Sequence, residues 1–275
     1  MKSIITTFFS FLIACQAMAQ DSSSVSQTSP YKMSWKVDAP VTAGFIGLNV
    51  LGLSLIQSKK GLTTVEALSA QNDKKSVNGI DRFSAGWYSK SIDKISYYPF
   101  YGSFAMPVVF LLNKNMGSKA GQVLSMYIET MAVTGAIYSI TAGSINRSRP
   151  YVYGTEAPLD KRMEKGARRS FFAGHTAATA SATFFAAKVF SDFNPDSKAK
   201  PYVWATAAAL PAFVGYCRLK GGNHFLTDNL LGYAVGAGAG ILVPHLHKQD
   251  RANNLSIVPV SAPDFNGLNL TYTFK

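Results

Sequence analysis

Residues 217–228 read Cys-Arg-Leu-Lys-Gly-Gly-Asn-His-Phe-Leu-Thr-Asp, and their spacing is the most informative feature of the chain. Arg218 lies six residues before His224, and Asp228 lies four residues after it. If His224 opens a helix, Asp228 lies one turn further along the same face, where a carboxylate can hold one imidazole nitrogen and leave the other free to attack. Arg218 adds a permanent, forked cation for phosphate oxygens. The stretch therefore predicts a phosphate-handling site at the start of a helix.

Two upstream segments complete a recognisable set. Arg149-Pro150 follows a long apolar stretch, and Ser170-Phe171-Phe172-Ala173-Gly174-His175 opens another. With residues 217–228, they resemble the three motifs of the type 2 phosphatidic acid phosphatase and vanadium haloperoxidase superfamily. Those motifs are Lys followed seven residues later by Arg-Pro, then Pro-Ser-Gly-His, then Ser-Arg with His and Asp at the spacing above. The resemblance covers residues 97–247 and implies an all-α fold, a six-helix bundle of the acid phosphatase and haloperoxidase type.

The chain departs from this family pattern at four positions. Ala142 stands where the first motif has Lys, Phe172 where Pro is usual, Ala173 where Ser is usual, and Cys217 where Ser precedes Arg218. A hydrogen bond to a charged group contributes roughly 1.5 to 3 kcal/mol, so these losses would weaken turnover without abolishing it. The cations that could replace the missing lysine are Arg147, Lys165, Arg168, Arg169 and Lys220.

The resemblance implies a role for each matching residue. His224 attacks the phosphorus and becomes a phosphohistidine, while Asp228 orients its ring and stabilises the imidazolium. His175 protonates the leaving group and then deprotonates the attacking water. No cofactor and no metal is expected, which makes the enzyme a metal-independent phosphoric monoester hydrolase. The phosphate oxygens are expected to bind Arg149, Arg218 and the backbone of Gly174.

Four functions remain open at this stage. The first is a phosphatase of the cell envelope that hydrolyses a lipid phosphate or diphosphate, and the second is a soluble periplasmic acid phosphatase of broad specificity. A haloperoxidase is disfavoured by the short chain and the missing lysine. A non-catalytic phosphate or lipid binder would explain Ala142, Phe172 and Ala173, but binding alone requires no acid paired with a nucleophile. The pair His245 and His247 is interpreted as solvated or interfacial, and the oligomeric state is undetermined.

The first nineteen residues resemble an export signal. Lys2 precedes the apolar run 4–14, and Ala17-Met18-Ala19 suits cleavage after Ala19. Residues 12–15, Leu-Ile-Ala-Cys, also resemble a lipoprotein box, which would make Cys15 a lipidated N-terminus instead. Either process leaves Cys217 without a disulfide partner. We therefore expect export to the bacterial cell envelope.

The rest of the chain divides into a helical phosphatase domain, residues 20–250, and a C-terminal tail, residues 251–275. The tail alternates apolar and polar residues and predicts a short β-hairpin, with strands at 255–260 and 267–274 joined by Pro263-Asp264. The domain contains six apolar segments whose lengths lie near the roughly 20 residues that span a bilayer. Charged residues interrupt them, so membrane embedding is only slightly favoured over a soluble periplasmic bundle, and the side that the site faces is open. The segments are 41–57, 97–112, 120–143, 171–190, 201–217 and 225–244.

The net charge of +12 raises the possibility of nucleic-acid binding. The positive residues, however, cluster in loops between apolar segments, at Lys59-Lys60, Lys74-Lys75 and residues 147–169, and no nucleic-acid motif accompanies them. Phosphate substrates or anionic lipid headgroups explain such loops better. The expected partners are therefore a phosphorylated lipid or other phosphoester and a membrane, and not a nucleic acid.

Overall fold

The computed structural model describes residues 29–249, 255–262 and 265–272. The expected export signal at residues 1–19, the alternative lipidation site Cys15 and the turn residues Pro263-Asp264 lie outside the described residues.

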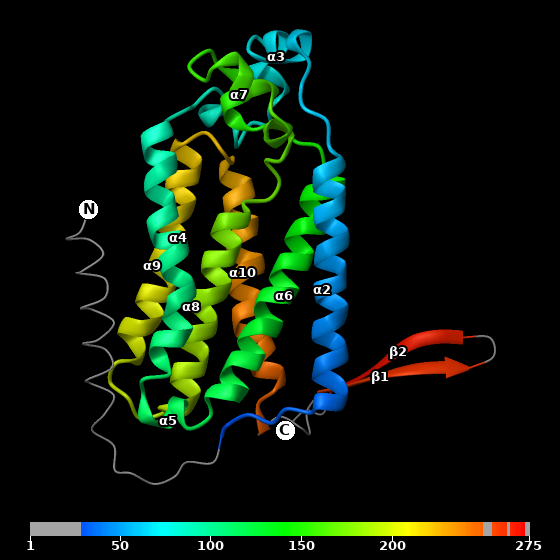
Figure 1. Ribbon diagram of the computed structural model, residues 1–275, viewed down its shortest axis with the longest axis vertical. Helices are drawn as coiled ribbons and strands as arrows, with labels where there is room; N and C mark the ends of the chain where they lie inside the picture. The colour runs from blue at the N-terminus through cyan, green and yellow to red at the C-terminus, as the bar shows by residue number, and fades with distance from the viewer. Residues whose placement is uncertain (1–28, 250–254, 263–264, 273–275) are drawn as a thin grey trace.

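Long helices running side by side form the body of the molecule (Figure 1). The expectation of a mainly helical chain is confirmed, and each predicted apolar segment lies largely within one of these helices. The central helix α8 packs against α4, α6, α9 and α10, while α2 packs at the edge of the bundle against α6. The long helices are α2 (Trp35–Ser58), α4 (Lys90–Phe110), α6 (Ala120–Ser144), α8 (Gly174–Phe193), α9 (Lys200–Lys220) and α10 (Leu226–Leu246).

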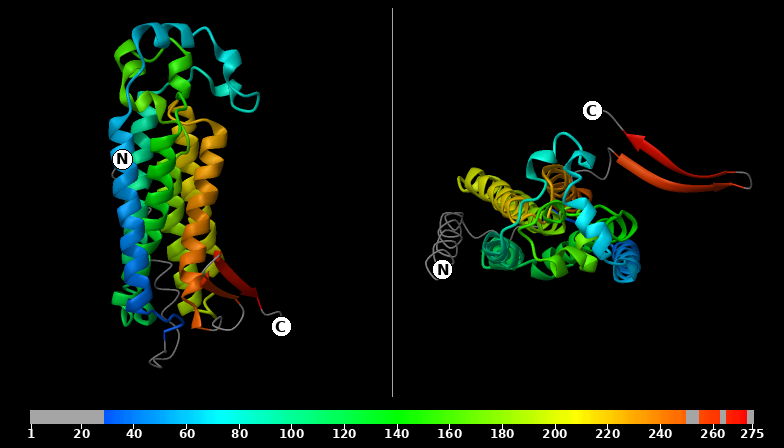
Figure 2. Two further views of the ribbon diagram at one scale, coloured as in Figure 1. Left: turned by 90° about the vertical axis from the view of Figure 1, so that its right-hand side faces the viewer. Right: turned by 90° about the horizontal axis from the view of Figure 1, so that it is seen from above.

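Short elements between the long helices were not predicted, and they bring the α-helices of the described part to nine. Most of them gather over one end of the bundle in a region that we call the cap, residues 59–89 and 145–173 (Figures 1 and 2). At the opposite end lies α5 (Lys114–Gly117). The cap helices are too short to give a clear helical period, which is why the sequence indicated only loops. The cap contains α3 (Thr64–Ala70), η1 (Lys74–Ser76), η2 (Arg82–Ser84), η3 (Pro150–Tyr153), α7 (Leu159–Met163) and η4 (Lys165–Arg168).

Three glycines allow α10 to pack directly on the backbone of α8. A Cβ atom on Gly236 would lie 2.0 Å from the carbonyl oxygen of Ala177, and Cβ atoms on Gly232 and Gly240 would lie 2.5 and 2.6 Å from backbone carbonyl oxygens of residues 173 and 181. A stripe of small residues at a spacing of four is the usual way to bring two helix backbones together. The packing fixes the N-terminal ends of both helices beside one another under the cap.

The end of the bundle remote from the cap is closed by buried polar contacts. The Tyr31 hydroxyl donates to Asp192 at 2.7 Å, and Tyr31 also pairs in a β-bridge with Lys248. His247 Nε2 lies 3.4 Å from Glu129 and 3.5 Å from Asp38, with its side chain only 9% exposed. The interpretation of His247 as solvated is therefore wrong, because its side chain lies against Asp38 of α2 and Glu129 of α6 and not in solvent.

After this end the chain forms an antiparallel pair of strands, β1 (Leu255–Ala262) and β2 (Phe265–Tyr272). The register pairs Leu255 with Tyr272 and Ala262 with Phe265. Figure 1 shows both strands projecting sideways from the bundle, near the end that is remote from the cap.

The sides of the bundle expose many large apolar side chains. On α2 alone, Val50 is 62% exposed and Leu51 is 53% exposed, and α4, α9 and α10 add further examples. Three helices of the described part, α2, α6 and α10, are long and apolar enough to cross a membrane. Soluble monomers rarely expose a continuous apolar patch larger than a few hundred Å². These side faces are therefore suited to a hydrocarbon environment.

Candidate active site

His224 lies in the tight turn between α9 and α10, directly under the cap. The turn requires glycine at position 222, where φ is +73° and a Cβ would lie 1.8 Å from the carbonyl oxygen of Trp87. The imidazole is 1% exposed, and its Nδ1 lies 2.5 Å from the carbonyl oxygen of Ser170. Because a carbonyl oxygen only accepts, this contact assigns the proton to Nδ1. The lone pair of Nε2 is left available for attack.

Asp228 is bonded differently from the sequence-based expectation. His224 precedes α10 and does not open it, since Phe225 is the N-cap, so the one-turn offset between the two residues does not apply. The Asp228 carboxylate accepts instead from the Phe225 backbone N–H at 2.9 Å and from the Ser170 hydroxyl at 2.6 Å. Ser170 therefore connects the two residues, because its carbonyl accepts from His224 while its hydroxyl donates to Asp228. The expected direct contact is replaced by this relay.

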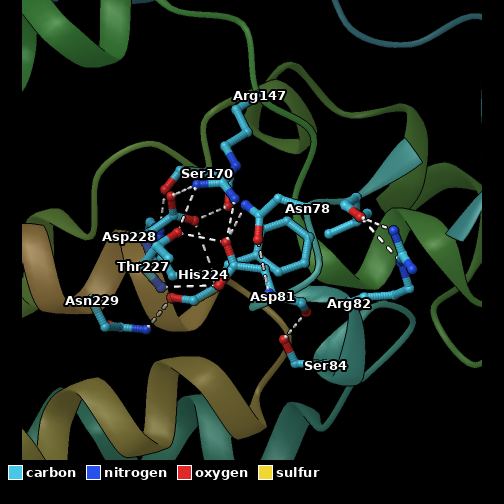
Figure 3. A network of polar contacts seen from close by, with 12 residues as sticks. Asn78, Asp81, Arg82, Ser84, Arg147, Ser170, His224, Thr227, Asp228 and Asn229 are labelled. Carbon is cyan, nitrogen blue, oxygen red and sulfur yellow. Dashed lines mark hydrogen bonds and ion pairs between the residues drawn. The ribbon is translucent and has the colours of Figure 1, made fainter. Parts of the chain in front are cut away.

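Arg147 joins Asp228 to a second buried carboxylate, Asp81 (Figure 3). The guanidinium bonds Asp228 through Nη1 and lies 2.6 Å from Asp81 through Nη2. Asp81 also accepts from the backbone N–H and the hydroxyl of Thr227, at 3.0 and 2.5 Å, and from Asn78 at 2.8 Å. Burial alone would raise the pKa of Asp81, but these hydrogen bonds bring the pKa below its usual value. An ionised Asp81 thus holds the cap to the first turn of α10.

The two arginines expected to bind phosphate are held by Asp93 and Asn223, which also bond to each other. Arg218, 2% exposed, bonds the Asp93 carboxylate, and Arg149 donates to the side-chain oxygen of Asn223 at 2.7 Å. The Asn223 amide closes the group by donating to Asp93 at 2.9 Å. The Nε atoms of Arg149 and Arg218 are both buried and have no hydrogen-bond partner in the described part of the chain. Other arginines of the described part also have an unpartnered Nε, but Arg149 and Arg218 are the two whose charges act on His224. Because an unpaired buried donor is costly, this pair is suited to receive an anion beside the imidazole.

The predicted site residues converge around His224. Burial lowers the pKa of His224 well below its usual value, and the positive charges of Arg149 and Arg218 lower it further, followed by His175. His175 lies in the first turn of α8, with its ring 4.3 Å from that of Phe100. The sixth predicted residue, Gly174, is the first residue of α8, and a Cβ there would lie 2.5 Å from the Tyr138 ring. Residues far apart in sequence thus surround one imidazole.

Most candidate replacements for the family lysine contact other groups. Ala142 is fully buried in α6. Lys165 donates to the backbone of α2, Arg168 pairs with Glu66, and Lys220 lies 4.0 Å from the Trp87 ring centroid. Arg147 is engaged by its two carboxylates. The Nε atoms of both Arg168 and Arg169 are buried without a partner among the described residues.

Sequence reasoning missed Asp81, Asp93, Asn223 and the relay through Ser170. Asn223 and Ser170 lie inside the stretches that drew attention, so their positions alone were a usable signal. Asp81 and Asp93 precede Arg149 of the first motif by 68 and 56 residues, and nothing in their local sequence marks them. Within residues 29–249, 255–262 and 265–272, no three His, Cys, Asp or Glu side chains are placed to hold a metal ion.

Comparison with known proteins gives one family match and two similar solved structures. Residues 124–252 match the model of the PAP2 superfamily, which confirms the resemblance seen in the motifs. LpxE from Aquifex aeolicus is 18% identical, with 59% of this chain and 90% of that chain covered and a TM-score of 0.42. The first transmembrane PAP2 type phosphatidylglycerolphosphate phosphatase from Bacillus subtilis is 19% identical, with 80% and 100% covered and a TM-score of 0.45. No curated protein matches the chain.

Proposed function

Because residues 124–252 belong to the PAP2 superfamily, we propose that this protein is a phosphatase that hydrolyses a lipid phosphate or diphosphate monoester. The observation that carries the proposal is the pair of buried, unpartnered Nε donors of Arg149 and Arg218 beside a neutral His224. Two fixed cations suit the charge spread over the oxygens of a transferring phosphoryl group. A buried imidazole with a lowered pKa is an unprotonated nucleophile at neutral pH.

In the proposed reaction, His224 Nε2 forms a bond to phosphorus while the bond from phosphorus to the leaving oxygen breaks. Burial lowers the pKa of His175 to about 3 in the free protein, and the charges of Arg218 and Arg149 contribute to this shift. In the proposed reaction the bound phosphate offsets these positive charges, so His175 takes up the proton of the phosphate monoanion and then gives it to the leaving oxygen. Neutral His175 then takes a proton from water, whose oxygen attacks phosphorus as the bond to Nε2 breaks and the electron pair returns to the ring. Ser170 holds the Nδ1 proton throughout, and Asp228 acts through Ser170 to stabilise the charged ring. Arg149, Arg218 and the α8 N-terminus at Gly174 hold the oxygens.

The proposal includes the organisation of the chain. Residues 20–250 form the phosphatase domain, a six-helix bundle of the acid phosphatase type to which the short helices are added. Residues 1–19 are the export signal, and residues 251–275 are a separate β tail. The exposed apolar sides and the three candidate spans support a bundle embedded in the membrane of the cell envelope, where a lipid substrate is present.

The test is turnover by purified protein with one lipid phosphate and one soluble phosphomonoester. We expect His224→Ala to lose about a thousandfold or more of kcat, as happens when a nucleophile is removed. His247→Asn is the matched control, because this histidine lies at the remote end of the bundle, and its kcat should stay near that of the wild type. Equal kcat in wild type and His224→Ala would refute the assignment.

A trapping experiment tests the intermediate separately. Alkaline quenching of wild-type protein during turnover of a labelled substrate should leave a phosphate on His224 that acid then releases. A label on another residue would exclude His224 as the nucleophile. Absence of both turnover and label, with the labelled anion still bound, would favour the non-catalytic binder instead.

A further inference from the structure

A hollow of about 400 Å³ lies between α8, α9 and α10, helices that Figure 1 shows as neighbours. We call it the groove. Its wall is mainly apolar and includes Pro211, Gly215, Tyr216 and Leu219 of α9 and Tyr233 of α10. This volume lies within the range of small-molecule sites, which are mostly apolar with a few polar groups.

The groove lies at the same height in the bundle as the candidate active site. Three of its wall residues are close sequence neighbours of site residues: Thr176 follows His175, Leu219 follows Arg218, and Leu226 comes two residues after His224. The near end of the groove is therefore within about one helical turn of the residues proposed to hold the phosphate.

The polar atoms of the inner wall are paired with each other. Thr176 donates its hydroxyl proton to Asn229 at 2.8 Å, and the Asn229 amide donates to the Phe225 carbonyl at 2.9 Å. Because these groups are already satisfied, the wall offers a ligand apolar contact. A molecule rich in hydroxyl or charged groups would lose hydrogen bonds to water on entering the groove.

The mouth of the groove opens on the side of the bundle. Tyr216 on α9 and Leu230 on α10 are wall residues, yet they are 54% and 60% exposed. Phe213 and Leu231, also exposed, continue the apolar surface around them. The groove therefore opens onto an apolar outer face at the height of the candidate active site.

We propose that the groove binds the hydrocarbon chain of the lipid whose phosphate is held by Arg149 and Arg218. This inference rests on the proposed function, and it makes the length of the chain a determinant of substrate choice. Gly215 is the residue that keeps the groove open, because a Cβ there would already touch Asn229 at 3.4 Å and Thr176 at 3.5 Å. A larger side chain at this position occupies the space of the hydrocarbon.

The test compares Gly215→Leu with Gly238→Leu, in which a Cβ atom meets open space. Each variant is assayed with a phosphatidic acid carrying sixteen-carbon chains and with a small soluble phosphomonoester. We expect Gly215→Leu to lose roughly tenfold or more in kcat/KM for the lipid and to keep kcat/KM for the small ester. Gly238→Leu should keep both. Equal losses on both substrates, or no loss on the lipid, would overturn the proposal.

A second measurement does not depend on how Gly215→Leu folds. A photoreactive group at the chain end of a lipid phosphate, bound to the inactive variant His224→Ala, should crosslink to Tyr216, Leu219 or Tyr233. Crosslinks only to α2 or α6 would place the chain elsewhere and refute the groove. Failure of the proposed function gives a different pattern, because wild-type protein would then hydrolyse neither substrate.

Discussion

The protonation state of His224 depends on a few neighbouring charges. Its pKa is lowered first by burial and then by Arg149 and Arg218, so the ring should stay unprotonated as the pH falls through 6.5, the ordinary pKa of a histidine. Only below the lowered pKa does the nucleophile gain a proton and lose its lone pair. In the proposed mechanism the two arginines therefore lower the pKa of His224 in addition to binding the anion.

Arg149→Met should therefore be more sensitive to acid than the wild type. Removal of one positive charge raises the pKa of His224, so the ratio of kcat/KM for variant and wild type should fall between pH 8 and pH 5. Taking the ratio cancels the ionisation of the substrate. Arg82→Met serves as the control, because Arg82 donates to backbone carbonyls of the cap and its ratio should not depend on pH. A flat ratio for Arg149→Met would contradict the tuning.

Asp81 is predicted to position the nucleophile through Arg147, Asp228 and Ser170. Asp81→Asn keeps the shape of the side chain but removes the charge opposite Arg147, and misplacement of a catalytic group can cost about a hundredfold. We expect a fall in kcat of this order with little change in KM, since the arginines that bind phosphate are untouched. Exposed Asp73→Asn is the control. A lowered Tm with unchanged kcat would indicate a purely structural role for Asp81.

At the scale of elements, the contact of α10 with α8 sets the distance between His175 and His224, the two histidines proposed to be catalytic, because each lies at or just before the start of one helix. Gly236→Ala forces a methyl group towards a carbonyl oxygen 2.0 Å away. We expect a loss of stability of about 1 to 3 kcal/mol, measured as a lower Tm, together with reduced turnover. Gly238→Ala, in open space on the same helix, should change neither. Equal Tm values for the two variants would show that α10 can shift without cost.

The long helices could be predicted from sequence, but their boundaries near the site could not. Apolar runs located α6 almost to the residue, because one continuous stretch is buried or faces an apolar surface along its whole length. The start of α10 was placed too early, since the turn at Gly221-Gly222 continues through His224 and places Phe225 at the N-cap. Because His224 was expected to open the helix, Asp228 was expected to bond its imidazole directly, which the structure does not show. A bond to the Ser170 backbone carbonyl leaves no trace in residue identity, so spacing could not reveal it.

At the scale of the whole molecule, the question is whether the exposed apolar sides of the bundle lie in a membrane or in water. If the bundle lies in a membrane, the expressed protein should sediment with membranes, resist extraction by high salt and dissolve only in detergent. Fractionation followed by assay of each fraction checks this. Recovery of active monomer in the soluble fraction would support the soluble acid phosphatase.

The two acids that organise the site both come from outside residues 124–252. Asp81 reaches the nucleophile side through Arg147, and Asp93 holds Arg218 and Asn223 on the phosphate side. The segment that carries the family match is consequently not a transplantable module. A chimera that grafts residues 124–252 onto a foreign N-terminal half would inherit the reacting groups without their counter-ions, and exchange between relatives should succeed only when residues 78–93 are transferred with them.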